Sequence, residues 1–429
     1  MANKDFTLGI EQARALDQQD ILRTFKDRFY PLADHKVYMD GNSLGLASVD
    51  AEKALLKVME VWKSQGILIW NEDDGHYFNY GKNLGGRVGK LINAGENEVM
   101  ITANTTMNIH QAIATFWKPT KERYKILIDD LNFPTDRYAI DSQVLLKGMN
   151  VDQVVKVVNS HSGVFIDQNA IIEAMTEDVA VILLPSVLYR SSQLLDMERL
   201  TVEAHKRGIY IGFDLCHSIG AVAHDFQAIQ PDFAVWCNYK YLSAGPGSTA
   251  GIYVNKKHFD KQVGLAGWFG NKDETQFQLK HQFDQALDVT AYQTGTPNIL
   301  SMAPLEGVLD IYEEAGMENI RAKSLNLTAY MMYLIDRRLS AYGYSYNNET
   351  EDAKRAGHVA LVHDEAYRIC LALKKHNIIP DYREPNVIRL APVALYNSYQ
   401  EVYHLIETLE IIGENKEWND FSTERAIVI

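Results

Sequence analysis

The sequence predicts an α/β fold in which a doubly wound, mostly parallel β-sheet forms the larger of two domains. Short apolar segments rich in Val and Ile alternate with helical patterns through the middle of the chain. After Pro304 the pattern changes to longer amphipathic helices. Such an alternation is typical of a parallel sheet covered by helices. We therefore expect a large domain over residues 50–310, a small α+β domain over residues 311–429, and an N-terminal segment, residues 1–49, that packs with the small domain.

The elements follow from their composition. Each predicted strand of the large domain is short and apolar, as buried parallel strands are, and they are Tyr124–Asp129, Val151–Val158, Asp178–Leu184, Gly208–Asp214, Asp232–Trp236 and Ala250–Val254. The helices predicted between them are Asp136–Lys147, Gln168–Met175 and Met197–Lys206; Gly208 stands where a glycine often ends a helix. For the small domain we expect the helices Lys323–Leu339, His363–Lys375 and Ser398–Ile412 and the strand Val387–Ala391.

Charge and composition argue against several classes of protein. The 429 residues include 42 Lys and Arg and 56 Asp and Glu, which gives a net charge of −14 and disfavours nucleic-acid and anionic-membrane partners. Apolar runs such as Ala180–Leu184 are too short to cross a bilayer, and the first residues lack the apolar core of a signal peptide. The three cysteines, Cys216, Cys237 and Cys370, form neither a disulfide framework nor a CxxC motif. We expect a cytoplasmic enzyme without a metal site.

Chemically active residues follow the predicted strands, where ligands of open α/β sheets bind. Asp214 ends one strand, Lys240 follows another, Phe133 precedes a helix, and Thr105 and Thr106 open a further helical pattern. A lysine can form an imine with an aldehyde, and a carboxylate can keep a pyridine nitrogen protonated. An aromatic ring can cover the pyridine, and hydroxyls at a helix start can hold phosphate. Together these residues favour pyridoxal phosphate (PLP) as cofactor.

Each of these signals has a simpler interpretation when taken alone. A strand-terminal Asp is about as often a helix cap, and a lone lysine after a strand is more often solvated. The segment AGPGSTAG after Lys240 matches neither GxGxxG nor the P-loop, so it does not indicate a nucleotide site. No metal-ligand spacing joins the other histidines considered, which are His110, His161 and His258.

Five segments, in order along the chain, resemble the motifs of kynureninases. They are Tyr38–Leu46 (YMDGNSLGL), Phe133–Tyr138 (FPTDRY), Trp236–Gly247 (WCNYKYLSAGPG), Gly267–Gly270 (GWFG) and Arg389–Pro392 (RLAP). The resemblance extends from about residue 20 to about residue 412. It implies a fold type I, aspartate-aminotransferase-like PLP enzyme that works as a homodimer with shared active sites.

The resemblance also implies roles for individual residues. Lys240 would form the Schiff base with PLP, Asp214 would pair with the pyridinium, and Tyr239 would deliver a proton. The cofactor shell would comprise Thr105, Thr106, Phe133, Pro134, Thr135, Asp136, Asp214, His217, Tyr239 and Lys240, with Trp268 and Thr296 contributed to the partner subunit's cofactor. Substrate would be bound by Arg389, which would clamp the α-carboxylate, and by Trp70, Asn42 and Ser43.

The activity implied is hydrolysis of L-kynurenine to anthranilate and L-alanine, in tryptophan and kynurenine catabolism. Trp70 and Thr296 resemble the pattern of enzymes that prefer L-kynurenine to its 3-hydroxy form. The sequence departs from the family at the loop Tyr189-Arg190-Ser191-Ser192-Gln193 and at Pro185. Two alternatives remain: another fold type I enzyme, such as an aminotransferase or a cysteine desulfurase, and a non-catalytic binding protein on the same scaffold.

Overall fold

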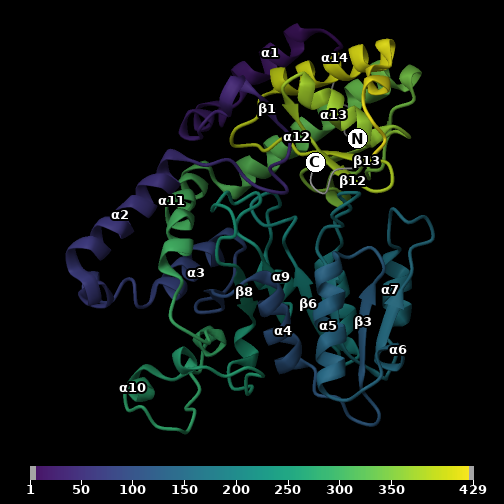
Figure 1. Cartoon of the computed structure of the whole chain (residues 1–429). Helices are drawn as coiled ribbons and strands as arrows, with labels where there is room; N and C mark the ends of the chain where they lie inside the picture. Colours follow the sequence, from purple (N-terminus) through teal and green to yellow (C-terminus); the bar gives the residue numbers. More distant parts are fainter. Residues whose placement is uncertain (1–5, 425–429) are drawn as a thin grey trace.

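The structure is a computed structural model that describes residues 6–424. Its large lower part contains a seven-stranded sheet (Figure 1). The strand order is β2-β8-β7-β6-β5-β3-β4, and the strands are β2 Val99–Ile101, β3 Lys125–Asp129, β4 Val155–Val158, β5 Val179–Pro185, β6 Tyr210–Asp214, β7 Phe233–Trp236 and β8 Gly251–Val254. Strands β3 to β7 are mutually parallel, which confirms the mostly parallel sheet.

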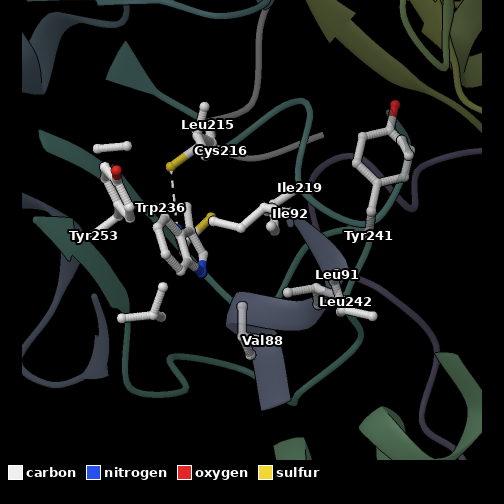
Figure 2. Packing of buried hydrophobic residues seen from close by; sticks show 14 of the residues in the cluster. Val88, Leu91, Ile92, Leu215, Cys216, Ile219, Trp236, Tyr241, Leu242 and Tyr253 are labelled. Carbon is white, nitrogen blue, oxygen red and sulfur yellow. Dashed lines mark hydrogen bonds between the residues drawn. The ribbon is translucent and has the colours of Figure 1, made fainter. Parts of the chain in front are cut away.

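Both faces of this sheet are buried, as a doubly wound fold requires. Within β3, Ile126 and Ile128 belong to one hydrophobic cluster, whereas Leu127 belongs to the cluster on the opposite face. The helices that cover the sheet include α3 Tyr80–Leu91, α4 Thr105–Phe116, α5 Pro134–Leu146, α7 Gln168–Ala174 and α8 Met197–Lys206. Figure 2 shows one cluster, in which the buried indole of Trp236 lies among Val88, Ile92 and Tyr253.

Two details of the predicted sheet are wrong. The segment predicted as one strand over Val151–Val158 begins as the helical turn α6 Val151–Val154, because the side chain of Asn150 caps two backbone N–H groups there. Strand β8, predicted as Ala250–Val254 among parallel strands, runs antiparallel to both β7 and β2. Its neighbour β2 was not predicted, since three residues carry too little pattern to identify a strand.

The upper part of the molecule contains a four-stranded antiparallel sheet with helices packed on it (Figure 1). Its strand order is β12-β13-β10-β9, with β9 Ser345–Tyr346, β10 Val359–Val362, β12 Asp381–Arg383 and β13 Val387–Leu390. The helices are α12 Met317–Leu334, which continues as a π-helical turn over Ile335–Leu339, α13 Ala366–Lys375 and α14 Tyr399–Asn415. These match the predicted elements to within a few residues, except that the helix predicted over Lys323–Leu339 begins earlier, at Met317.

The N-terminal residues join both parts of the molecule. Helix α1 Ile10–Gln19 lies along α14, where Asp17 accepts a hydrogen bond from the backbone of Tyr399 at 2.7 Å (Figure 1). Strand β1 Val37–Tyr38 pairs with β11 Ile378–Ile379. Farther along, α2 Val49–Gln65 packs against α11 Ile299–Ala315, which contains Pro304. The chain between β1 and α2 therefore passes between the two sheets and brings residues 40–46 to their junction. None of the helices in residues 6–424 is long and apolar enough to span a membrane.

Candidate active site

A cavity of about 270 Å³ opens at the carboxyl ends of β6 and β7, between the two sheets. Most of the predicted site residues line it: Asn42, Ser43, Thr105, Thr106, Phe133, Thr135, Asp214, His217, Tyr239, Lys240 and Arg389. Three further residues line it without having been assigned a role, namely Tyr189, Cys216 and Arg383. The segments that follow β2, β3, β5, β6 and β7 and the segment around residue 42 thus converge on one space, as the strand-end pattern predicted.

Lys240 places its amine deep in this cavity, beside a histidine. Its Nζ lies 3.0 Å from Nε2 of His217 and 5.9 Å from the centre of the Phe133 ring. Burial opposes the charge of this ammonium, but nearby negative charge, at Cys237 first and then at Cys216 and Asp214, outweighs burial, so the pKa of Lys240 is raised.

His217 is neutral in this setting. Burial, and then the charge of Lys240, hold the pKa of His217 well below its usual value. Nε2 therefore accepts the hydrogen bond from Lys240, which leaves the ring proton on Nδ1. That Nδ1 has no hydrogen-bond partner among the described residues.

Of two buried acids at this site, Asp214 lines the cavity and Asp136 does not. Asp214 ends β6 and accepts a hydrogen bond from the backbone N–H of Cys216 at 2.7 Å. Asp136 lies in the first turn of α5, behind Pro134, and neither of its carboxylate oxygens has a hydrogen-bond partner in residues 6–424. Burial raises the pKa of both acids, and the charge of Asp214 raises that of Asp136 further. A cationic group in front of them would relieve both effects.

The opposite end of the cavity offers hydroxyl groups and a helix start. Thr105 and Thr106 begin α4, whose N-cap, Asn104, accepts a hydrogen bond from the backbone of Met107. The Thr106 hydroxyl lies 2.9 Å from that of Thr135. The free N–H groups and dipole of a helix start favour an anion.

Arg389 and its neighbours define the third side. The Arg389 side chain is 1% exposed and donates to the Ser43 hydroxyl at 2.8 Å and to the Tyr189 carbonyl at 3.1 Å. Asn42 is fully buried, and its amide has no partner among the described residues. An unpaired buried amide that faces a cavity is suited to bind a polar ligand.

Five predicted residues do not line this cavity: Pro134 and Asp136, in the first turn of α5, and three that lie farther away. Trp70, Trp268 and Thr296 line a second cavity of about 570 Å³, together with apolar side chains such as Phe78 and Phe277. Trp268 is 41% exposed, so this wall of the molecule is open to solvent in the single chain.

Comparisons with known proteins identify the family. The C-terminal residues 320–409 match the model described as the kynureninase C-terminal domain. The kynureninase of Geobacillus thermodenitrificans is 50% identical over 419 residues, which cover 98% of both chains. That of Bacillus cereus is 50% identical over 428 residues and 100% of both chains. The chain belongs to the kynureninase family.

The fold agrees with this assignment. The cysteine desulfurase of Thermococcus onnurineus, at a TM-score of 0.77 and 16% identity, covers 91% of this chain and 98% of its own. A C-DES mutant with glycine covalently linked to its PLP cofactor has a TM-score of 0.76 at 15% identity and covers 90% of this chain and 98% of its own. At these identities the likeness shows only the fold, fold type I, whereas the full-length kynureninase relatives favour neither the aminotransferase nor the desulfurase alternative.

Sequence reasoning missed Tyr189, Cys216 and Arg383 as cavity residues. Tyr189 was noted only as part of a loop departure, and Cys216 only as one of three cysteines without a disulfide or CxxC pattern. Arg383 precedes a turn and carries no motif of its own. The one signal for it is its place in the strand that pairs with the Arg389 strand, which a hairpin pattern around Pro385 and Asn386 could have indicated.

Proposed function

We propose that this member of the kynureninase family hydrolyses L-kynurenine to anthranilate and L-alanine with PLP bound in the 270 Å³ cavity. The observation that carries the proposal is that Lys240, Asp214 and Arg389 line one cavity. The chain that forms this cavity is 50% identical to a kynureninase over its whole length. A non-catalytic binding protein would need no buried lysine amine opposite a buried acid.

The residues at this site suit two parts of PLP, the pyridine nitrogen and the phosphate. The unpartnered oxygens of Asp136 and the raised pKa of Asp214 suit a protonated pyridine nitrogen. The start of α4, with the Thr106 and Thr135 hydroxyls, suits the phosphate. When bound, PLP supplies an electron sink for bonds broken at the substrate α- and β-carbons.

The side chains around the cofactor site have separate roles. Lys240 would hold the cofactor through its aldehyde, and its amine would take and return the proton at the substrate α-carbon. His217, which is neutral, accepts a hydrogen bond from the Lys240 amine and so orients it in the cavity. Asp214 and Asp136 would keep the pyridine nitrogen protonated, and Phe133 would cover the ring.

Residues on the other side of the cavity bind the substrate and deliver a proton. Arg389 holds the α-carboxylate, and Asn42 and Ser43 supply further polar contacts. Burial, together with Cys237, raises the pKa of Tyr239, so its phenol keeps its proton and can deliver it to the β-carbon when alanine forms. Water attacks the γ-carbonyl, and its oxygen leaves in the anthranilate carboxylate.

The proposed assembly is a cytoplasmic homodimer in which each subunit completes the other's site. It is supported by the exposed apolar cavity around Trp70, Trp268 and Thr296, which stands apart from the Lys240 cavity in one chain. Paired in a dimer, that wall would cover the aryl group of the substrate on the partner.

The test is product analysis on purified, PLP-loaded protein. With L-kynurenine we expect anthranilate and L-alanine in equal amounts, and none from the Lys240→Ala variant. Pyruvate from alanine, or sulfur release from cysteine, as the main reaction would instead support one of the related enzymes.

A further inference from the structure

The carboxylate of Asp381 faces Arg389 across two paired strands. In the antiparallel pair β12–β13, Asp381 stands directly opposite Arg389, and Arg383 lies two residues farther along the Asp381 strand. Side chains two residues apart point to the same face of a strand. Asp381, Arg383 and Arg389 therefore share one face of the small sheet, the face that borders the Lys240 cavity.

Asp381 occupies one edge of the Arg389 guanidinium. Its Oδ2 accepts a hydrogen bond from Nε and forms an ion-pair contact with Nη2. Nη2 also donates a hydrogen bond to the Ser43 hydroxyl, and Nη1 donates one to the Tyr189 carbonyl. Since a guanidinium has five N–H donors in a rigid plane, one Nη1 hydrogen remains for a ligand.

This hydrogen-bond pattern determines which edge of the Arg389 guanidinium a ligand carboxylate can reach. The side edge, Nε and Nη2, is closed, so a ligand from the cavity must meet the end edge. There it can take the remaining Nη1 hydrogen and replace the Ser43 hydroxyl at Nη2. A hydroxyl can rotate from acceptor to donor, so Ser43 can then donate to the same ligand.

Arg383 shows why an acid is needed at this point. Its Nε lies 3.1 Å from Oδ2 of Asp381, so two guanidiniums share one carboxylate. Without Asp381 two like charges would face each other beside the cavity. With it, these three side chains carry a single net positive charge, and the guanidinium of Arg389 is paired although it is buried.

We propose that Asp381 is a positioning residue: by holding the side edge of Arg389, it presents the end edge to the α-carboxylate of the substrate. This inference rests on the proposed function and deepens it by naming the residue that sets carboxylate recognition. The opposite arrangement is that Asp381 competes with the substrate for Arg389. Removing the Asp381 charge would weaken substrate binding if Asp381 positions Arg389, and would strengthen it if Asp381 competes with the substrate.

The test compares ligands with and without a carboxylate on PLP-loaded protein. Dissociation constants for L-alanine, and for the amine left when L-kynurenine loses its carboxylate, are measured from the change in cofactor absorbance. Asp381→Asn should weaken L-alanine binding about 10- to 100-fold, as displaced binding groups do, and leave the amine unaffected. Asp364→Asn, the same change at an exposed acid of the small domain, should alter neither.

A second variant separates position from charge. Asp381→Glu keeps the charge but moves the carboxylate by one methylene, so we expect it also to lose affinity for L-alanine selectively. Unchanged or tighter L-alanine binding in Asp381→Asn, unchanged L-alanine binding in Asp381→Glu, or equal losses for both ligands would overturn the inference. Failure of the wild-type protein to convert L-kynurenine would instead overturn the proposed function.

Discussion

The Lys240 amine and the Asp214 carboxylate lie at the ends of neighbouring strands, and their surroundings are those of reactive groups. Lys240 is held by His217 at 3.0 Å, and Asp214 is held by the Cys216 backbone at 2.7 Å. Strand ends were the guide to both residues in the sequence. Partners such as Asp381 and Arg383 could not be predicted, because their role depends on pairing between strands and not on a motif.

At the residue scale, Lys240→Ala should abolish covalent attachment of PLP and lower turnover by several orders of magnitude, because the amine that bonds and moves protons is lost. Borohydride treatment followed by peptide mass spectrometry measures the attachment. Lys206→Ala, at an exposed lysine on α8, is the control. Attachment to a different lysine in the wild-type protein would contradict the assignment.

At the element scale, the sequence predicted the strands of the large sheet better than their directions. The Val, Ile and Leu residues of β3 and β5 indicate strands buried on both faces, but the reversal of β8 depends on the turn that follows Lys240. At the carboxyl end of β3, this burial also encloses an ionisable side chain. Asp129 is buried, its Oδ2 has no partner in the described part of the chain, and burial raises its pKa to about 7.

This pKa predicts a pH-dependent loss of stability. The folded pKa lies above the unfolded value, so stability is full below the unfolded pKa and falls as pH rises toward 7. Asp129→Asn cannot ionise and keeps the Oδ1 bond from the backbone of Leu131. From pH 5 to pH 7 the variant should gain about 2 kcal/mol in free energy of unfolding relative to wild type, measured with urea. A difference that stays constant with pH would contradict the burial argument.

The segment that contains Trp70 and the loop that contains Thr296 predict substrate choice. An indole offers apolar contact to a bare aryl edge, whereas a site built for a hydroxyl needs polar partners. We expect a higher kcat/KM for L-kynurenine than for 3-hydroxykynurenine, and Trp70→His combined with Thr296→Asn should shift the preference toward the 3-hydroxy form. A wild-type preference for 3-hydroxykynurenine would contradict this interpretation of the pocket.

At the scale of the whole molecule, two separate cavities in one chain predict complementation between subunits. Lys240→Ala and Trp268→Ala proteins should each be weakly active or inactive. In a mixed dimer one site carries both lesions and the other carries neither, so activity should return toward half that of a wild-type dimer. Absence of recovery after subunit exchange has been verified by mass would count against shared sites.

The most direct test of the whole account is hydrolysis of L-kynurenine in water enriched in ¹⁸O. If water attacks the γ-carbonyl, anthranilate should carry one ¹⁸O in its carboxylate and L-alanine should carry none, as read by mass spectrometry of both products. Unlabelled anthranilate, or a keto acid in place of L-alanine, would contradict the proposed reaction.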